Sequence, residues 1–211
     1  MKTVALLAAL AAAGLPAAGL AQDDPPDDPV SVTGTFAPVN AAGSGIAGRI
    51  TLAASDGTLT IALDADGVSP GVHLAHIHGY ATVDPREAVC PDATADANDD
   101  GVIDVIELRR TAGITMVPLT SDPASLEIAA EGYPEAGDDR ALTWQEQVPT
   151  QALEDVVQAA YEGPLDLPRR VVLLHGVPEA TDLPDSVASL QGVSAHRTLP
   201  IACAELAVTE E

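Results

Sequence analysis

A series of short apolar segments, separated by turn-forming residues, limits this chain more than any other feature of its sequence. Segments with β-branched or alternating apolar residues are typical of strands. In the first half of the chain they are Val32–Pro38, Gly48–Ala53, Thr58–Ala65 and Val72–His78. In the second half they are Ile114–Leu119, Ser125–Ala130, Arg170–His175 and Leu199–Val208. Their lengths and spacing predict an all-β antiparallel sandwich or barrel.

The segment Thr150–Tyr161 differs, because its apolar residues recur at helical spacing. We expect one short helix here, carried in a long connection between strands. The polar segment Gly132–Gln147, which holds the only tryptophan, is predicted to be a loop.

The first 21 residues have the pattern of an export signal, with Lys2, an Ala/Leu-rich stretch and a small-residue cleavage site at Gly19–Ala21. An uncleaved anchor is the alternative, but the apolar stretch is short and Pro16 interrupts it. Residues 22–31 are acidic and proline-rich, which predicts a disordered tether. We therefore expect a periplasmic or secreted protein with one β-domain over residues 32–211.

The charge balance excludes two classes of partner. Apart from Lys2, the chain has eight arginines against 32 acidic residues. Nucleic acid and anionic membrane surfaces would repel such a protein, whereas calcium and other cations would be attracted. A solubility adaptation to an external setting is the simpler explanation of most of this charge.

Three of the five histidines lie in the run from Gly71 to Gly79. On an extended strand His76 and His78 point to one side, and His73 points to the other. Two adjacent imidazoles are half of a site for copper, zinc, iron or nickel. Coincidence is the alternative for the pair alone.

The most specific local motif is a twelve-residue loop of the EF-hand type over residues 96–107. Calcium prefers six to eight oxygen ligands, and Gly101 and Ile103 occupy the turn and apolar positions of the motif. The predicted ligands are Asp96, Asn98, Asp100, the Val102 carbonyl, Asp104 and Glu107. Only Pro91–Ala95 separates the loop from Cys90, which leaves no room for an entering helix. We therefore expect a single structural calcium loop rather than a paired sensor.

The chain resembles the copper/zinc superoxide dismutase family in three segments that occur in the family's order. TLTIALDADGVSPGVHLAHIHGY resembles its GLHGFHVH-type segment, RRVVLLHGVPEATDL its RTLVVHEKADDL-type segment, and LPIACAEL its RLACGVI-type ending. The resemblance implies a Greek-key β-sandwich or flattened barrel. It also implies that His76, His78 and His175 bind copper. His73 corresponds to a histidine that lies next to the copper ligands and does not bind the metal itself.

Two cysteines in an exported protein favour a disulfide over two buried thiols, and the resemblance pairs Cys90 with Cys203.

The departures from the family concern its zinc half. No histidine occurs between Gly79 and Leu174, so a zinc site of the family type cannot form, and the calcium loop occupies that region. The family's arginine near copper corresponds to Pro200, although Arg197 lies close by as a weak substitute. His196 is a weak candidate for a fourth copper ligand.

Three functions remain open at this point. The first is an exported redox protein that dismutes superoxide at copper. The second is a non-enzymatic copper-binding protein. The third is a calcium-stabilised surface-binding module with structural histidines, which the likeness of AHIHG to segments of chordin-type domains would fit.

Overall fold

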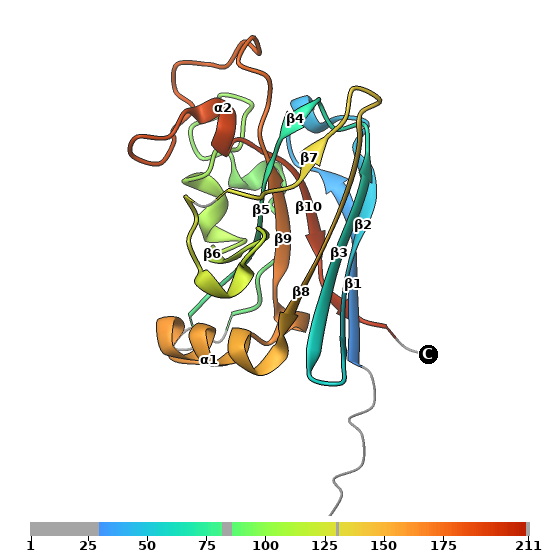
Figure 1. The fold of residues 1–211 in the computed structure, drawn as a ribbon. Helices are drawn as coiled ribbons and strands as arrows, with labels where there is room; N and C mark the ends of the chain where they lie inside the picture. The colour runs from blue at the N-terminus through green and yellow to red at the C-terminus, as the bar shows by residue number, and fades with distance from the viewer. Residues whose placement is uncertain (1–29, 82–85, 130, 210–211) are drawn as a thin grey trace, which may run out of the picture.

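The fold is taken from a computed structural model that describes residues 30–81, 86–129 and 131–209. Nine strands of the described chain form one curled antiparallel sheet, a half-barrel with strand order β6-β5-β9-β10-β1-β2-β3-β8 (Figure 1). The strands of this sheet are β1 Val30–Pro38, β2 Ala47–Ser55, β3 Thr58–Asp66, β5 Leu74–Gly79, β6 Ile114–Pro118, β8 Ala141–Pro149, β9 Val171–His175, β10 Pro200–Glu205 and β11 Ala207–Val208, which pairs with β1. The prediction of an all-β antiparallel architecture is confirmed.

The smaller elements lie in the connections. A separate two-stranded sheet pairs β4 (Gly71–Val72) with β7 (Glu135–Ala136). The helices are α1 Thr150–Tyr161 and α2 Ala195–Thr198, and the 3-10 turns are η1 Ala41–Gly43, η2 Ala93–Ala95, η3 Glu107–Arg110, η4 Pro123–Ser125 and η5 Leu167–Arg169. The predicted helix in a long connection is therefore confirmed as α1.

The main core fills the inner face of the curled sheet. On β3 the buried residues Leu59, Ile61, Leu63 and Ala65 alternate with more exposed ones, as expected for a strand with one face in the core. The hairpin between β2 and β3 turns at Asp56 and Gly57, which have φ angles of 50° and 74°. Positive φ at both central residues matches the twist of a two-residue hairpin.

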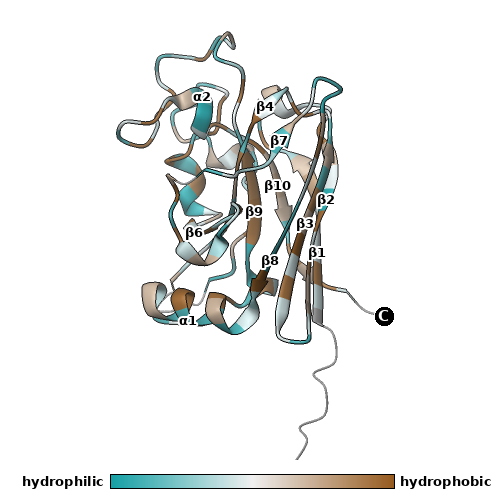
Figure 2. Cartoon of the chain, viewed as in Figure 1, coloured by the Kyte–Doolittle hydropathy of each residue, from teal (hydrophilic) through white to brown (hydrophobic). Residues whose placement is uncertain are grey.

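The strands that carry the histidines are buried on both faces. All residues of β5 and β9 are buried, and β9 is apolar from Val171 to Leu174 (Figure 2). On β9, Val172 and Leu174 contact the main core, whereas Val171 and Leu173 contact a second core beneath the segment 86–112. The outer face of these strands is therefore a protein interior, in which polar side chains lose contact with water.

The predicted disulfide is present, between Cys90 and Cys203 of β10. It fastens the segment that precedes the acidic loop to the sheet. The exit segment of that loop forms η3, and the segment between Cys90 and the loop contains only the short turn η2. Neither flank is a full helix, in agreement with the lack of room before the loop.

Several predicted boundaries were wrong. The segment Gly132–Gln147 contains β7 and most of β8, which pairs with β3 over nine residues, and is not a loop. Residues 125–129 form no strand, because η4 ends there and Leu126 has a φ of 55°. The strand predicted at Val72–His78 is divided at His73 into β4 and β5, and β1 begins at Val30, inside the predicted tether.

The predicted export signal lies outside the described residues. Within them, no helix combines the length and apolar character needed to cross a bilayer.

Candidate metal centre

Three histidines from two paired strands meet at one point of the sheet. β5 supplies His76 and His78, and its antiparallel neighbour β9 ends at His175. One ring nitrogen of each lies within 4.8 Å of one ring nitrogen of each of the others. In the described part of the chain, this is the one group of three or more His, Cys, Asp or Glu residues with ligand atoms so close. The structure thus brings together the three histidines predicted as copper ligands, here called the histidine triad.

Strand geometry accounts for the arrangement of the triad. His76 and His78 are two residues apart on β5 and therefore share a face. The pairing of β5 with β6 shifts register between Ile77 and His78, where Met116 of β6 has no partner on β5. The ring centroids of the triad are separated by 5.4 to 5.8 Å.

Burial keeps the triad neutral. It lowers the pKa of His175 to about 4, an effect that a hydrogen bond with the Thr198 backbone partly opposes. Burial, and then the charge that His175 would carry, hold the pKa values of His76 and His78 well below the usual range. For His78, the Gly113 backbone opposes the shift and the charge of Arg109 adds to it. A neutral imidazole keeps a nitrogen lone pair, which is the form that binds metals.

The triad has buried nitrogens without partners. His76 Nδ1, His78 Nδ1 and His175 Nε2 accept or donate no hydrogen bond to any described residue. An unpaired buried polar atom costs about 1–3 kcal/mol, so three together need an explanation. A metal ion bound by these rings would supply one.

The other two histidines lie outside the triad. The ring of His73 contacts two backbone carbonyls, those of His175 at 3.0 Å and Ser69 at 2.7 Å. His196 was predicted as a weak fourth copper ligand, but the structure does not bring it to the triad. Its Nε2 instead lies 2.9 Å from the Thr181 carbonyl, and its Nδ1 lies 3.7 Å from Glu179.

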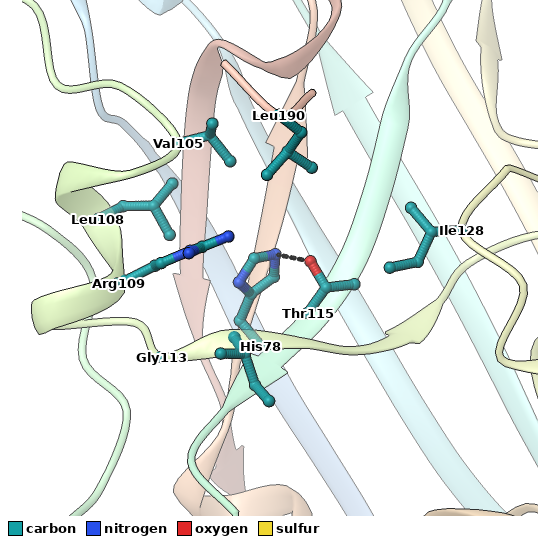
Figure 3. Close-up of a pocket in the computed structure, with 9 residues that line it drawn as sticks. His78, Val105, Leu108, Arg109, Gly113, Thr115, Ile128 and Leu190 are labelled. Carbon is teal, nitrogen blue, oxygen red and sulfur yellow. Dashed lines mark hydrogen bonds between the residues drawn. The ribbon is translucent and has the colours of Figure 1, made fainter. Parts of the chain in front are cut away.

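Two cavities reach the triad from the surface. One, of about 380 Å³, is lined by His76, His175 and Arg197 among other residues. The second, of about 200 Å³, is lined by His78 and Arg109, and Figure 3 shows the Arg109 side chain extending from the neighbouring turn toward the His78 ring. Solvent and small solutes can therefore approach the triad through these cavities.

Each cavity carries an arginine without a counterion. The side chains of Arg109 and Arg197 are exposed, and neither makes an ion pair or hydrogen bond with a described residue. The charge of Arg109 lowers the pKa of His78, and that of Arg197 partly opposes the rise in the pKa of Tyr133. Two of the eight arginines of a strongly acidic chain thus flank the triad.

Tyr133 contacts the triad and had no signal in the sequence. Its hydroxyl lies 2.9 Å from His76 Nε2 and donates to the Ile128 carbonyl, also at 2.9 Å. Burial raises the pKa of this hydroxyl to about 12. Tyr133 comes from the histidine-free middle of the chain, where no metal-site motif pointed to it.

The acidic loop 96–107 turns back on itself through its own side chains. Asp96 accepts a hydrogen bond from the Gly101 amide at 2.8 Å, and Asp100 accepts one from the Val102 amide at 2.8 Å. Glu107 reaches back to the Ala97 amide at 2.8 Å. The side chains predicted to bind calcium therefore surround one turn, although no three of their carboxylates lie as close together as the triad nitrogens.

The loop is also tied to the rest of the fold. Asn40, which is buried, accepts from the Ile103 amide and donates to the carbonyls of Ile103 and Pro200, at 2.8 to 2.9 Å. The buried Asp104 accepts from the Ala188 amide at 2.7 Å. These contacts join the loop to the sheet and to the segment before α2.

Comparison with known proteins adds no relative. Neither the family models nor the curated proteins searched contain a match to this chain.

Proposed function

We propose that this protein is an exported metal-binding protein whose histidine triad binds copper. The observation that supports it is the meeting of three neutral, buried imidazoles, with one ring nitrogen of each within 4.8 Å of one ring nitrogen of each of the others. Each of these rings also has a buried nitrogen without a hydrogen-bond partner. Imidazole suits copper and zinc alike, and the resemblance to copper/zinc superoxide dismutases favours copper. Bound copper would supply one-electron redox chemistry. The disulfide is consistent with an oxidising compartment outside the cytosol.

The copper/zinc superoxide dismutase-like fold is the architecture we propose for the chain. Three features support it: the triad, the disulfide partners and the carbonyl contacts of His73 all lie at the matching motifs. The sheet also places β10, from the end of the chain, beside β1 from its start. The protein departs from the family by lacking the zinc histidines.

Copper titration followed by electron paramagnetic resonance tests the site. Wild-type protein should bind one equivalent of Cu²⁺ with hyperfine structure from nitrogen ligands. His175→Ala should weaken binding strongly, whereas His196→Ala, which removes a histidine outside the triad, should not. Equal effects of the two substitutions, or no nitrogen coordination in wild type, would leave only the surface-module function.

Superoxide dismutation is a second candidate, which the two arginines favour. Superoxide is an anion, and the overall charge of the chain repels it. Arg109 and Arg197 place unpaired positive charge at the two cavities that lead to the triad. Dismutation converts two superoxide ions and two protons into dioxygen and hydrogen peroxide. In this reaction the chain's own residues would attract the anion and keep the triad neutral.

An assay on copper-loaded protein separates this enzyme from a non-enzymatic copper binder. The dismutase activity should exceed that of a copper–chelator complex without protein, and it should fall as ionic strength rises. The double variant Arg109→Gln, Arg197→Gln should have lower activity than wild type, and Arg140→Gln serves as the control. Copper binding without activity would support the non-enzymatic alternative.

We also propose that the loop 96–107 binds a structural calcium ion. The support is the twelve-residue ligand pattern and the turn that gathers its side chains. Calorimetric titration of wild type should show one site, and calcium should raise the unfolding temperature. Glu107→Gln should abolish both effects and leave copper binding intact, whereas Glu127→Gln should change neither. An unfolding temperature insensitive to calcium would refute this part of the proposal.

A further inference from the structure

The hydrogen bonds of Tyr133 define which nitrogen of His76 carries a proton. A phenol has a single hydrogen, and Tyr133 donates it to the Ile128 carbonyl, which can only accept. The Tyr133 oxygen is then available to His76 only as an acceptor, at 2.9 Å. His76 must therefore carry its hydrogen on Nε2. In the neutral ring this leaves the lone pair on Nδ1, the buried nitrogen without a partner.

The tautomer of His175 is fixed in the same way, by a backbone acceptor. Its Nδ1 lies 2.8 Å from the Thr198 carbonyl, so Nδ1 carries the hydrogen. The lone pair of His175 is then on Nε2, which is again the unpartnered nitrogen. Two rings of the triad thus have opposite tautomers, each fixed by an acceptor outside the triad. The acceptor for His175 belongs to the main chain, whereas the acceptor for His76 is a replaceable side chain.

The fold holds Tyr133 firmly in place. It is 7% exposed, and its ring meets the His76 ring edge to face, with centroids 5.4 Å apart and planes at 80°. The following residue, Pro134, accepts a hydrogen bond from the His73 amide at 2.9 Å, and β7 then pairs with β4. The segment that carries Tyr133 is therefore attached to the strand segment that carries the histidines.

We propose that Tyr133 is a positioning residue for the histidine triad, which fixes the tautomer and the ring direction of His76 so that the lone pair on Nδ1 is available to a metal ion. Outer groups that orient ligand histidines in this way commonly contribute 10- to 100-fold to metal affinity. The role in metal binding rests on the proposed copper site. The tautomer itself does not, because it belongs to the metal-free protein.

The first experiment is a long-range ¹H–¹⁵N correlation spectrum of metal-free, ¹⁵N-labelled protein at neutral pH. Wild type should show His76 with hydrogen on Nε2 and His175 with hydrogen on Nδ1. In Tyr133→Phe, the His76 signals should move toward a mixture of tautomers while those of His175 stay unchanged. Hydrogen on Nδ1 of His76 in wild type would overturn the proposal, whether or not the protein binds copper.

The second experiment measures copper affinity in the same variants. Tyr133→Phe should bind Cu²⁺ about 10- to 100-fold more weakly than wild type. Tyr161→Phe is the matched control, since its hydroxyl donates to the backbone carbonyls of Thr115 and Met116, which lie outside the triad. Unchanged affinity in Tyr133→Phe would overturn the positioning role. So would a phenolate-to-copper absorption band present in wild type and absent from Tyr133→Phe, because Tyr133 would then be a ligand.

Discussion

Acidification of the metal-free protein should destabilise the fold through the histidine triad. Burial lowers the pKa of His175 to about 4, whereas an unfolded histidine titrates near 6.5. Between these values the unfolded chain binds a proton that the folded chain excludes, so stability is full above the upper pKa and is lost as the pH falls toward the lower one. From these two values, His175 alone accounts for a loss of about 2.5 kcal/mol between pH 7 and pH 4.5. His76 and His78 have depressed pKa values as well and add to it.

Urea unfolding with a chelator present, followed by the fluorescence of Trp144, measures this loss. His175→Asn should make the drop between pH 7 and pH 4.5 smaller by roughly 2–3 kcal/mol. The titration of carboxylates is shared with wild type and cancels in the comparison. His196→Asn, which removes a histidine outside the triad, serves as the control. If His175→Asn lost as much stability as wild type on acidification, the triad would not be a buried neutral group and the reasoning would fail.

Two further predictions concern the segments that surround the triad. Asn40→Ala removes three buried hydrogen bonds and leaves backbone groups of Ile103 and Pro200 unpaired, so it should lower the free energy of unfolding by about 2–4 kcal/mol in a urea titration. Replacing both Cys90 and Cys203 with alanine should cost about 2–5 kcal/mol, and reductant should lower the unfolding temperature of wild type but not of this variant.

The alternation of apolar and polar residues predicted most of the strands. β3 alternates buried and exposed residues along its length, so its period of two is visible in the sequence. β8 is as long, but only Leu142 and Val148 are buried on it, and polar residues dominate the rest. It is a strand because it pairs with β3 throughout, and pairing between distant segments leaves no local pattern.

The same distinction applies to the site. The shared face of His76 and His78 follows from their spacing alone. His175 joins them through the pairing of β5 with β9, two segments nearly a hundred residues apart, so only the family resemblance could connect them. Tyr133 reaches the triad from an irregular segment, and Arg109 approaches it from the short turn η3; tertiary contacts set the course of both. Neither residue type nor spacing marks them in the sequence.

Different parts of the fold form the acidic loop and the triad, but residues in or next to the loop's contacts line the cavities that lead to the triad. Arg109 lies in η3, directly after the loop, and lines the cavity at His78. Asp104 binds the Ala188 amide, two residues before Leu190, which lines both cavities. The triad itself depends on the pairing of β5 with β9. A variant that loosens the loop should therefore alter the cavities that lead to the triad, and with them any effect of Arg109 on an incoming anion. The positions of the three ring nitrogens should change less. A loop variant that lost copper affinity as fully as His175→Ala would contradict this division, because it would mean that the loop holds the ligands and not only the walls around them.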